Sequence, residues 1–235
     1  MAGEQHRRRL RALLKLAGIR TAGDGFAHVE RAFVHESLAK ESGVRSNERM
    51  EFLGDSVLGF IVAGWVFEHF RDEAEGRLTL RKAAIVNDEQ LATTARRLGF
   101  SELVQLSGGM RTAGGTENRS ILAAAFEAFL AALYVGYGIE RARRFVVKEH
   151  VAHVDHDPEQ HLDAKTRLQH YAQEHLSATP VYRESSRGTP QRPAFQSKVA
   201  VNGKTLGTGS GPSKKVAQRA AAEAALKKLQ ARDKA

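Results

Sequence analysis

Three carboxylates share one face of a predicted helix near residue 50. Glu48, Glu51 and Asp55 lie in the string NERMEFLGDSVL, residues 47–58, at positions i, i+3 and i+7. On an α-helix this spacing gathers them into a sector of about 60°. Carboxylate oxygens are hard ligands that suit Mg²⁺ together with water and substrate phosphate. The spacing fits a divalent-metal site, and it also fits a solvated acidic face, which on spacing alone is the commoner arrangement.

A further carboxylate lies in a segment that should be buried. Glu127 falls within residues 121–134, ILAAAFEAFLAALY, a predicted helix with apolar residues on nearly every side. A lone ionised carboxylate there would cost on the order of several kcal/mol unless it were paired or bound to metal. Arg49 is one possible partner for an ion pair. A metal ion shared with the acidic face near residue 50 would compensate both groups at once.

The region around residue 155 is rich in histidine. It contains His150, His153, His156 and His161, together with Asp155, Asp157 and Pro158. Such a cluster only suggests a metal site, because the side chains need not converge, and we interpret the stretch as a polar linker. The chain contains no cysteine, which excludes disulfides, thiolate metal sites and cysteine nucleophiles.

Residues 1–150 are predicted to form a mainly α-helical domain. Apolar residues recur at helical spacing in segments that glycine clusters separate. The longest apolar run, residues 121–138, is interrupted by Glu127 and is shorter than the ~20 residues that a membrane span needs. The N-terminus shows no signal-peptide pattern. We therefore expect a cytoplasmic protein that does not enter a membrane.

Positive charge is concentrated toward the C-terminus. Residues 157–235 contain 14 Lys and Arg against 7 Asp and Glu, whereas the preceding residues contain 22 basic and 20 acidic side chains. A basic module beside a nearly neutral one is typical of a polyanion-binding domain attached to a second domain. The alternative is a surface whose extra Lys and Arg only increase solubility.

The basic part is predicted to be a small α+β domain. Its expected elements are a helix at 162–175, strands at 181–183, 195–201 and 205–209, and a final helix that continues to Leu229. Asn202–Gly203 is a strong hairpin-turn signal between the last two strands. Ser213 is a plausible N-cap for the final helix. The order is therefore α-β-β-β-α.

These motifs resemble those of the ribonuclease III family. The string at 47–58 resembles the family signature, and the segments Phe33–Ser37, Glu75–Thr79 and 121–134 resemble those around it in the family's order. Residues 163–230 resemble the double-stranded-RNA-binding domain of bacterial members. The resemblance implies an endonuclease domain at 1–150, a linker at 151–158 and an RNA-binding domain at 159–232.

The resemblance also implies roles for the acidic residues. Glu51, Asp55 and Glu127 match carboxylates that hold a catalytic Mg²⁺, which Mn²⁺ can replace. Glu48 and Glu75 match acidic residues associated with the RNA-processing centre. The implied reaction is hydrolysis of double-stranded RNA by metal-activated water, which leaves 5′-phosphate and 3′-hydroxyl ends. The implied role is the processing of ribosomal RNA, messenger stems and other structured precursors.

One position departs from the family pattern. The family usually has Asp three residues before the second-helix Glu, and this chain has Ala124. That position would share a face with Glu127, so the site lacks a fourth carboxylate. We expect activity to be retained, because Mg²⁺ sites in proteins often keep several waters, although metal binding would be weaker.

Phe52 is expected to project beside the acidic face, away from the core-facing side of its helix, on which the wheel places Met50, Leu53, Val57, Phe60 and Ile61. An exposed aromatic next to a functional face is typical of an interface. The resemblance implies a homodimer in which this Phe enters a socket on the partner. The alternative is a Phe that loops of its own domain cover.

The candidate RNA contacts lie in three segments of the C-terminal domain: Thr166, Gln169, His170 and Gln173; Gln191; and Ser213, Lys214 and Lys215. Double-stranded RNA is bound through its minor groove, its 2′-hydroxyls and its phosphates, mostly by shape. Neutral hydrogen-bonding side chains on the first helix suit the 2′-hydroxyls. The two lysines at the start of the last helix suit phosphate. His170 and Gln191 replace the usual Glu and His of the family.

Two other functions fit the same residues. Ala124 could have disabled the metal site, which would leave a non-cleaving regulator that binds double-stranded RNA. The protein could also be an architectural helical dimer whose acidic face binds a basic protein.

Overall fold

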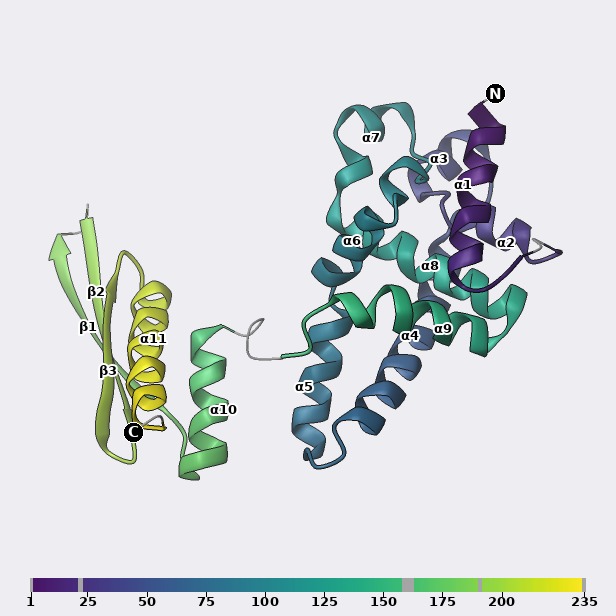
Figure 1. Ribbon diagram of the computed structural model, residues 1–235. Helices are drawn as coiled ribbons and strands as arrows, with labels where there is room; N and C mark the ends of the chain where they lie inside the picture. Colours follow the sequence, from purple (N-terminus) through teal and green to yellow (C-terminus); the bar gives the residue numbers. More distant parts are fainter. Residues whose placement is uncertain (1, 21–22, 158–162, 190–191, 234–235) are drawn as a thin grey trace. The chain divides into compact units, whose positions relative to one another are not determined.

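A computed structural model describes the chain except for residues 1, 21–22, 158–162, 190–191 and 234–235. It divides into two compact units, Met1–Pro158 and Glu159–Ala235. Figure 1 shows a first unit built from helices and a second unit in which the C-terminal helix lies against a small sheet and a second helix lies beside that helix. The predicted combination of a mainly α domain and a small α+β domain is therefore confirmed.

The first unit contains α1 (Ala2–Leu16), α2 (Phe26–Arg31), α3 (Glu36–Ser42), α4 (Glu48–His69), α5 (Glu75–Val86), α6 (Asp88–Arg97), α7 (Gly108–Thr112), α8 (Arg119–Tyr137) and α9 (Ile139–Glu149), with short 3-10 helices at Phe100–Glu102, Gly115–Glu117 and Val151–His153. Helix α8 contributes more buried apolar side chains to the core than any other helix of the unit. Its Phe126 and Phe129 pack in edge-on and tilted pairs with three phenylalanines from other segments, namely Phe33, Phe100 and Phe145. Aromatic pairs in these geometries contribute about 0.5–1.5 kcal/mol each beyond the area that they bury.

Helices α4 and α8 are both long and apolar enough, by length and composition alone, to cross a membrane. In α8 the apolar residues are explained by packing, because its side chains from Ile121 to Ala123 and from Ala128 to Leu133 are buried inside the unit. A central helix of a folded domain has this composition without any lipid contact.

The second unit has the expected α-β-β-β-α order. It contains α10 (Ala164–Leu176), β1 (Val181–Thr189), β2 (Arg192–Val201), β3 (Lys204–Gly211) and α11 (Lys214–Asp233). The strands form an antiparallel sheet in the order β1-β2-β3. Asn202 and Gly203 have φ of 48° and 76°, the positive values that a tight two-residue hairpin turn requires. The hairpin predicted at these two residues is confirmed.

Helix α11 packs closely against the sheet because small residues face each other. A methyl group at Gly207 or Gly209 would overlap the backbone of Ala221, so only glycine allows this approach. Ala217, Ala221 and Ala225 are fully buried at the same contact. Ser213 caps the helix as predicted, because its Oγ accepts a hydrogen bond from the Val216 amide at 3.3 Å.

Residues 151–157, expected as a linker, pack against the first unit. Val151 is buried in the core, and the His156 ring lies against Trp65 with centroids 4.7 Å apart. Arg81 donates a hydrogen bond to the His156 carbonyl oxygen at 2.8 Å and forms an ion pair with Glu73. The chain is thereby fixed to helices α4 and α5 as far as residue 157.

Two of the histidines near residue 155 have hydrogen-bond partners within the first unit. His150 is fully buried, with Nδ1 2.8 Å from Thr94 Oγ1 and Nε2 2.9 Å from the Ile85 carbonyl oxygen. The Nε2 atom of His156 lies 2.6 Å from the Val151 carbonyl oxygen. His161 lies outside the described residues. The three described histidines do not gather into a metal site.

Candidate functional site

Helices α4 and α8 cross at a point that joins the two acidic segments. A methyl group at Gly54 would overlap the carbonyl oxygen of Glu127 and would lie 3.0 Å from its Cα, so the two backbones are in contact there. Gly54 is flanked by Asp55 and lies one turn after Glu51 on α4. The crossing therefore brings the acidic face of α4 beside Glu127, as the sequence suggested.

Helix α8 reaches the surface at Ala124 and Glu127, the positions of the expected Asp and Glu of the family pattern. Among residues 121–133, Ala124 and Glu127 are half-buried and all the others are buried. They are three residues apart and share a helix face. Ala124 thus lies on the same open face as Glu127, where it contributes no oxygen.

The surroundings of the Glu127 carboxyl group disfavour its ionised form. The pKa of this group is raised to about 8, first by burial and then by the charges of Asp55, Glu51 and Asp88. No Lys or Arg of the described residues forms an ion pair with Glu127, Arg49 included. The predicted alternative, a Glu127–Arg49 ion pair, is therefore wrong. The group lies in a carboxylate-rich setting that a bound cation would relieve.

Asp88 was not found by sequence reasoning. It is the first residue of α6, follows the N-cap Asn87, and its charge raises the pKa of both Glu51 and Glu127. For Glu51 the largest cause is burial, and the charges of Glu48 and Asp88 act in the same direction. No spacing in the sequence links Asp88 to residues 47–58, because only the packing of α6 against α8 brings it near.

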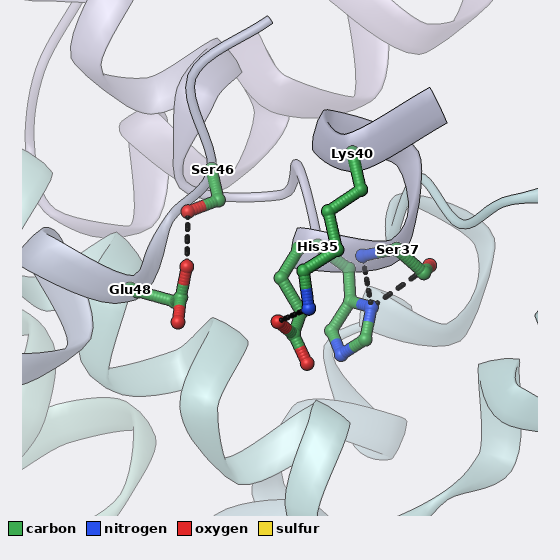
Figure 2. A network of polar contacts seen from close by, with 6 residues as sticks. His35, Ser37, Lys40, Ser46 and Glu48 are labelled. Carbon is green, nitrogen blue, oxygen red and sulfur yellow. Dashed lines mark hydrogen bonds and ion pairs between the residues drawn. The ribbon is translucent and has the colours of Figure 1, made fainter. Parts of the chain in front are cut away.

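Glu48 lies at the edge of this group. It is exposed at the start of α4 and accepts a hydrogen bond from Ser46 Oγ at 2.7 Å. Figure 2 shows this pair beside His35, Ser37 and Lys40. The His35 Nδ1 atom accepts a hydrogen bond from the Ser37 amide at 3.2 Å. The hydrogen bond from Ser46, in the loop before α4, therefore holds Glu48 at the exposed start of the helix.

Glu75 lies apart from the other carboxylates. It is exposed at the first position of α5 and accepts a hydrogen bond from Thr79 Oγ1 at 3.0 Å. Its charge is not among the causes that raise the pKa of Glu51 or Glu127. Within the described residues, no three His, Asp or Glu side chains converge closely enough to hold a metal ion. The carboxylates are neighbours, but the structure does not draw them into a cage of ligands.

Phe52 is 78% exposed, so no loop of its own unit covers it. Phe60 is 62% exposed, and its predicted place in the core is wrong. Phe60 lies between the buried side of α4 and Phe52 on the helix wheel, and the neighbouring Ile61 fills the core position instead. Phe67, also on α4, is 70% exposed. These three rings fall within about 80° of one another around the helix and form an apolar stripe, called here the phenylalanine stripe.

The predicted RNA contacts on α10 lie on the surface of the second unit. Gln169 and Gln173 are exposed, and Thr166 donates a hydrogen bond to the N-cap residue Asp163 at 2.8 Å. Thr166 and Gln169 line a hollow of about 560 Å³, and Lys215 lies on its other side. This hollow brings α10 residues and one of the two predicted lysines together.

The remaining predicted contacts differ in what the structure shows. His170 is half-buried, and its Nδ1 atom has no hydrogen-bond partner among the described residues. Ser213, Lys214 and Lys215 are exposed at the start of α11, where free backbone N–H groups favour anions. Gln191 lies outside the described residues.

Comparisons with known proteins agree with this arrangement. A family model described as ribonuclease-III-like matches residues 27–154, and a double-stranded RNA binding motif matches residues 164–229. A ribonuclease 3 from Roseiflexus sp. (strain RS-1) is 39% identical over 202 residues, which are 85% of each chain. A ribonuclease 3 from Anoxybacillus flavithermus is 41% identical over 204 residues, 85% of this chain and 86% of the relative.

Solved structures give the same result for the first unit. The nuclease domain of the Campylobacter jejuni ribonuclease III is 33% identical, with a TM-score of 0.54, and the match covers 60% of this chain and 92% of that domain. That structure is described as showing flexibility in a region involved in dimer formation. On the sequence match, the helical fold and the carboxylates at the α4–α8 crossing, the chain belongs to the ribonuclease III family of endoribonucleases and carries a double-stranded-RNA-binding domain.

Proposed function

We propose that this chain is a Mg²⁺-dependent endoribonuclease that cuts double-stranded RNA and leaves 5′-phosphate and 3′-hydroxyl ends. The observation that carries the proposal is the unpaired Glu127, whose pKa is raised to about 8 beside Asp55, Glu51 and Asp88. Carboxylate oxygens without a basic partner are the donor set that Mg²⁺ prefers, so the chemistry of these residues, rather than the present positions of their side chains, fits a hard divalent ion.

Glu51, Asp55 and Glu127 would hold the ion, and Asp88 would add negative charge at its edge. When bound, a divalent ion activates water and offsets charge on the scissile phosphate. The carboxylates would also hold that water in position by accepting its hydrogen bonds. Because Ala124 contributes no oxygen, we expect weaker metal binding than a site with four carboxylates would have.

The second unit supplies the RNA-binding surface. Exposed Gln169 and Gln173 suit 2′-hydroxyls, and Lys214 and Lys215 suit the phosphates. Such contacts recognise the shape of the duplex, which fits the processing of structured precursors such as ribosomal RNA in the cytoplasm. Binding of this kind positions the duplex without selecting one sequence.

We propose further that the active form is a homodimer built through the phenylalanine stripe of α4. Three exposed rings on one helix are more apolar surface than an isolated monomer normally shows. Next to the stripe, a hollow of about 620 Å³ is lined by Met50, Leu53, Ala131 and Val135 together with basic residues. This hollow is large enough to receive Phe52 of a second copy.

A cleavage assay tests the enzyme against the rival of a non-cleaving RNA-binding regulator. Long double-stranded RNA is incubated with the wild type and with Glu127→Gln, with Mg²⁺ or with a chelator, and the termini are mapped. We expect Mg²⁺-dependent cleavage by the wild type and binding without cleavage by the variant. Intact RNA with the wild type at every Mg²⁺ concentration, alongside clear binding, would establish the regulator instead.

A further inference from the structure

A second basic region lies in the first unit, away from the carboxylates. Described residues within 15–20 and 23–25, from the end of α1 onward, and at the turn between α8 and α9 line an open cavity of about 1330 Å³. Four cations line it, namely Lys15, Arg20, Arg141 and Arg144, and Asp24 is its one acidic residue among the described positions. Four glycines also line it, together with Ile19 and Tyr137.

Two of the guanidinium groups are held close together over Gly18. A methyl group at Gly18 would lie 2.9 Å from Arg141 Nη1 and 3.3 Å from Arg144 Nη1, so these nitrogens are at most about 6 Å apart. Gly18 has a φ of 77°, which favours glycine, and its carbonyl oxygen accepts a hydrogen bond from Arg141 Nη1 at 3.1 Å. The backbone at Gly18 therefore fixes one guanidinium and leaves space for the second.

This arrangement lacks a counter-charge within the protein. In the part of the chain that the structure describes, none of the four cations forms an ion pair, with Asp24 or with any other carboxylate. Elsewhere in the same unit arginines are paired, as Arg81 is with Glu73 and Arg7 with Glu30. Like charges held together without a carboxylate are the arrangement that an external anion stabilises.

We infer that this cavity, called here the Gly18 cavity, is a second RNA-binding site that contacts phosphates of the RNA backbone. Guanidinium groups match the geometry of phosphate oxygens and donate two parallel hydrogen bonds. The cavity is open and larger than one phosphate needs, which favours consecutive phosphates of a polymer over a single small anion. The inference rests on the proposed function, because the polyanion that this chain meets is its RNA substrate.

Salt-dependent binding of the full chain to a long RNA duplex tests the inference. Lys15→Gln with Arg144→Gln removes two charges without touching the Arg141–Gly18 hydrogen bond. We expect roughly tenfold weaker binding at low salt, and a slope of log K against log salt that is shallower by about 2, near 0.9 for each lost phosphate contact. The matched control is Arg8→Gln, which removes an exposed charge from α1 outside the cavity, and its slope should equal that of the wild type.

Two further measurements show whether weaker binding comes from the lost charges or from misfolding. The thermal unfolding midpoint of the double variant should not fall, because it removes a repulsion, so weaker binding cannot come from misfolding. Cleavage of a long duplex at sub-saturating enzyme should slow in proportion to the loss of binding in the double variant, whereas Arg8→Gln should cleave at the wild-type rate. Two results would overturn the inference. One is a salt slope in the double variant that equals the wild-type slope. The other is tighter binding of inorganic tripolyphosphate by the wild type than by the double variant while both proteins bind RNA equally. If the wild type does not cleave the duplex at all, that result contradicts the proposed function instead.

Discussion

Glu127→Gln should stabilise the metal-free protein at neutral and alkaline pH, although it should abolish cleavage. The pKa of Glu127 rises from 4.5 to about 8 in the folded chain. The stability that the neutral carboxyl group allows is therefore fully present below pH 4.5 and is lost as the pH rises through about 8. Glutamine keeps the shape of the neutral acid and removes this loss.

The size of the effect follows from the pKa. Each pKa unit corresponds to about 1.4 kcal/mol, so the full rise would be worth about 5 kcal/mol in a fully buried group. Glu127 is only half-buried, and solvent screens much of this, so we expect about 2 kcal/mol at pH 9. At pH 4 the two proteins should have nearly the same free energy of unfolding.

Urea unfolding in the presence of a chelator measures this difference. The chain has a single tryptophan, Trp65 on α4, so its fluorescence follows the first unit alone. Glu41→Gln is the control, because Glu41 is exposed at the end of α3 and should show no such trend. A Glu127→Gln variant that is less stable than the wild type at pH 9, or a difference independent of pH, would refute the reasoning. Addition of Mg²⁺ should stabilise the wild type and leave the variant unchanged.

Three further outcomes are expected. Phe52→Ala should weaken a dimer about 30-fold or more in sedimentation experiments, since a central interface aromatic is worth at least about 2 kcal/mol, and an unchanged association constant would place the interface elsewhere. Lys214→Gln with Lys215→Gln should lower the salt slope of RNA binding by about 2, and an unchanged slope would exclude both lysines as phosphate contacts. Burial lowers the pKa of His150 to about 4, so the free energy of unfolding of the first unit should decrease as the pH falls from 6.5 to about 4. That loss, at most about 3 kcal/mol, should be absent in His150→Gln.

Local signals predicted much of the fold. Positive φ at Asn202 and Gly203 and the cap at Ser213 both follow from residue type, because such preferences act within a few residues. The apolar composition of residues 121–134 correctly indicated a core helix, which is buried from Ile121 to Leu133 except at Ala124 and Glu127, whereas the opening to the surface at these two positions was not predicted. These features depend on local chemistry and on burial, which a sequence displays directly.

Features that depend on tertiary packing were harder to predict. Asp88 reaches the acidic group because α6 packs against α8, and no periodicity indicates which helices are neighbours. The helix wheel placed Phe60 on the core-facing side of α4, but where the buried side of a helix ends depends on how its neighbours pack against it, and Phe60 lies beyond that edge. The Gly18 cavity joins the end of α1 to the α8–α9 turn across more than 100 residues, so no motif could reveal it.

We propose that the site cleaves RNA although Ala124 contributes no carboxylate. The most direct test of this claim is the single-turnover rate of duplex cleavage as a function of Mg²⁺ concentration, for the wild type and for Ala124→Asp. We predict cleavage by the wild type at saturating Mg²⁺, and half-maximal rate at a lower Mg²⁺ concentration in Ala124→Asp. No cleavage by the wild type at any Mg²⁺ concentration, with cleavage restored in Ala124→Asp, would contradict the claim.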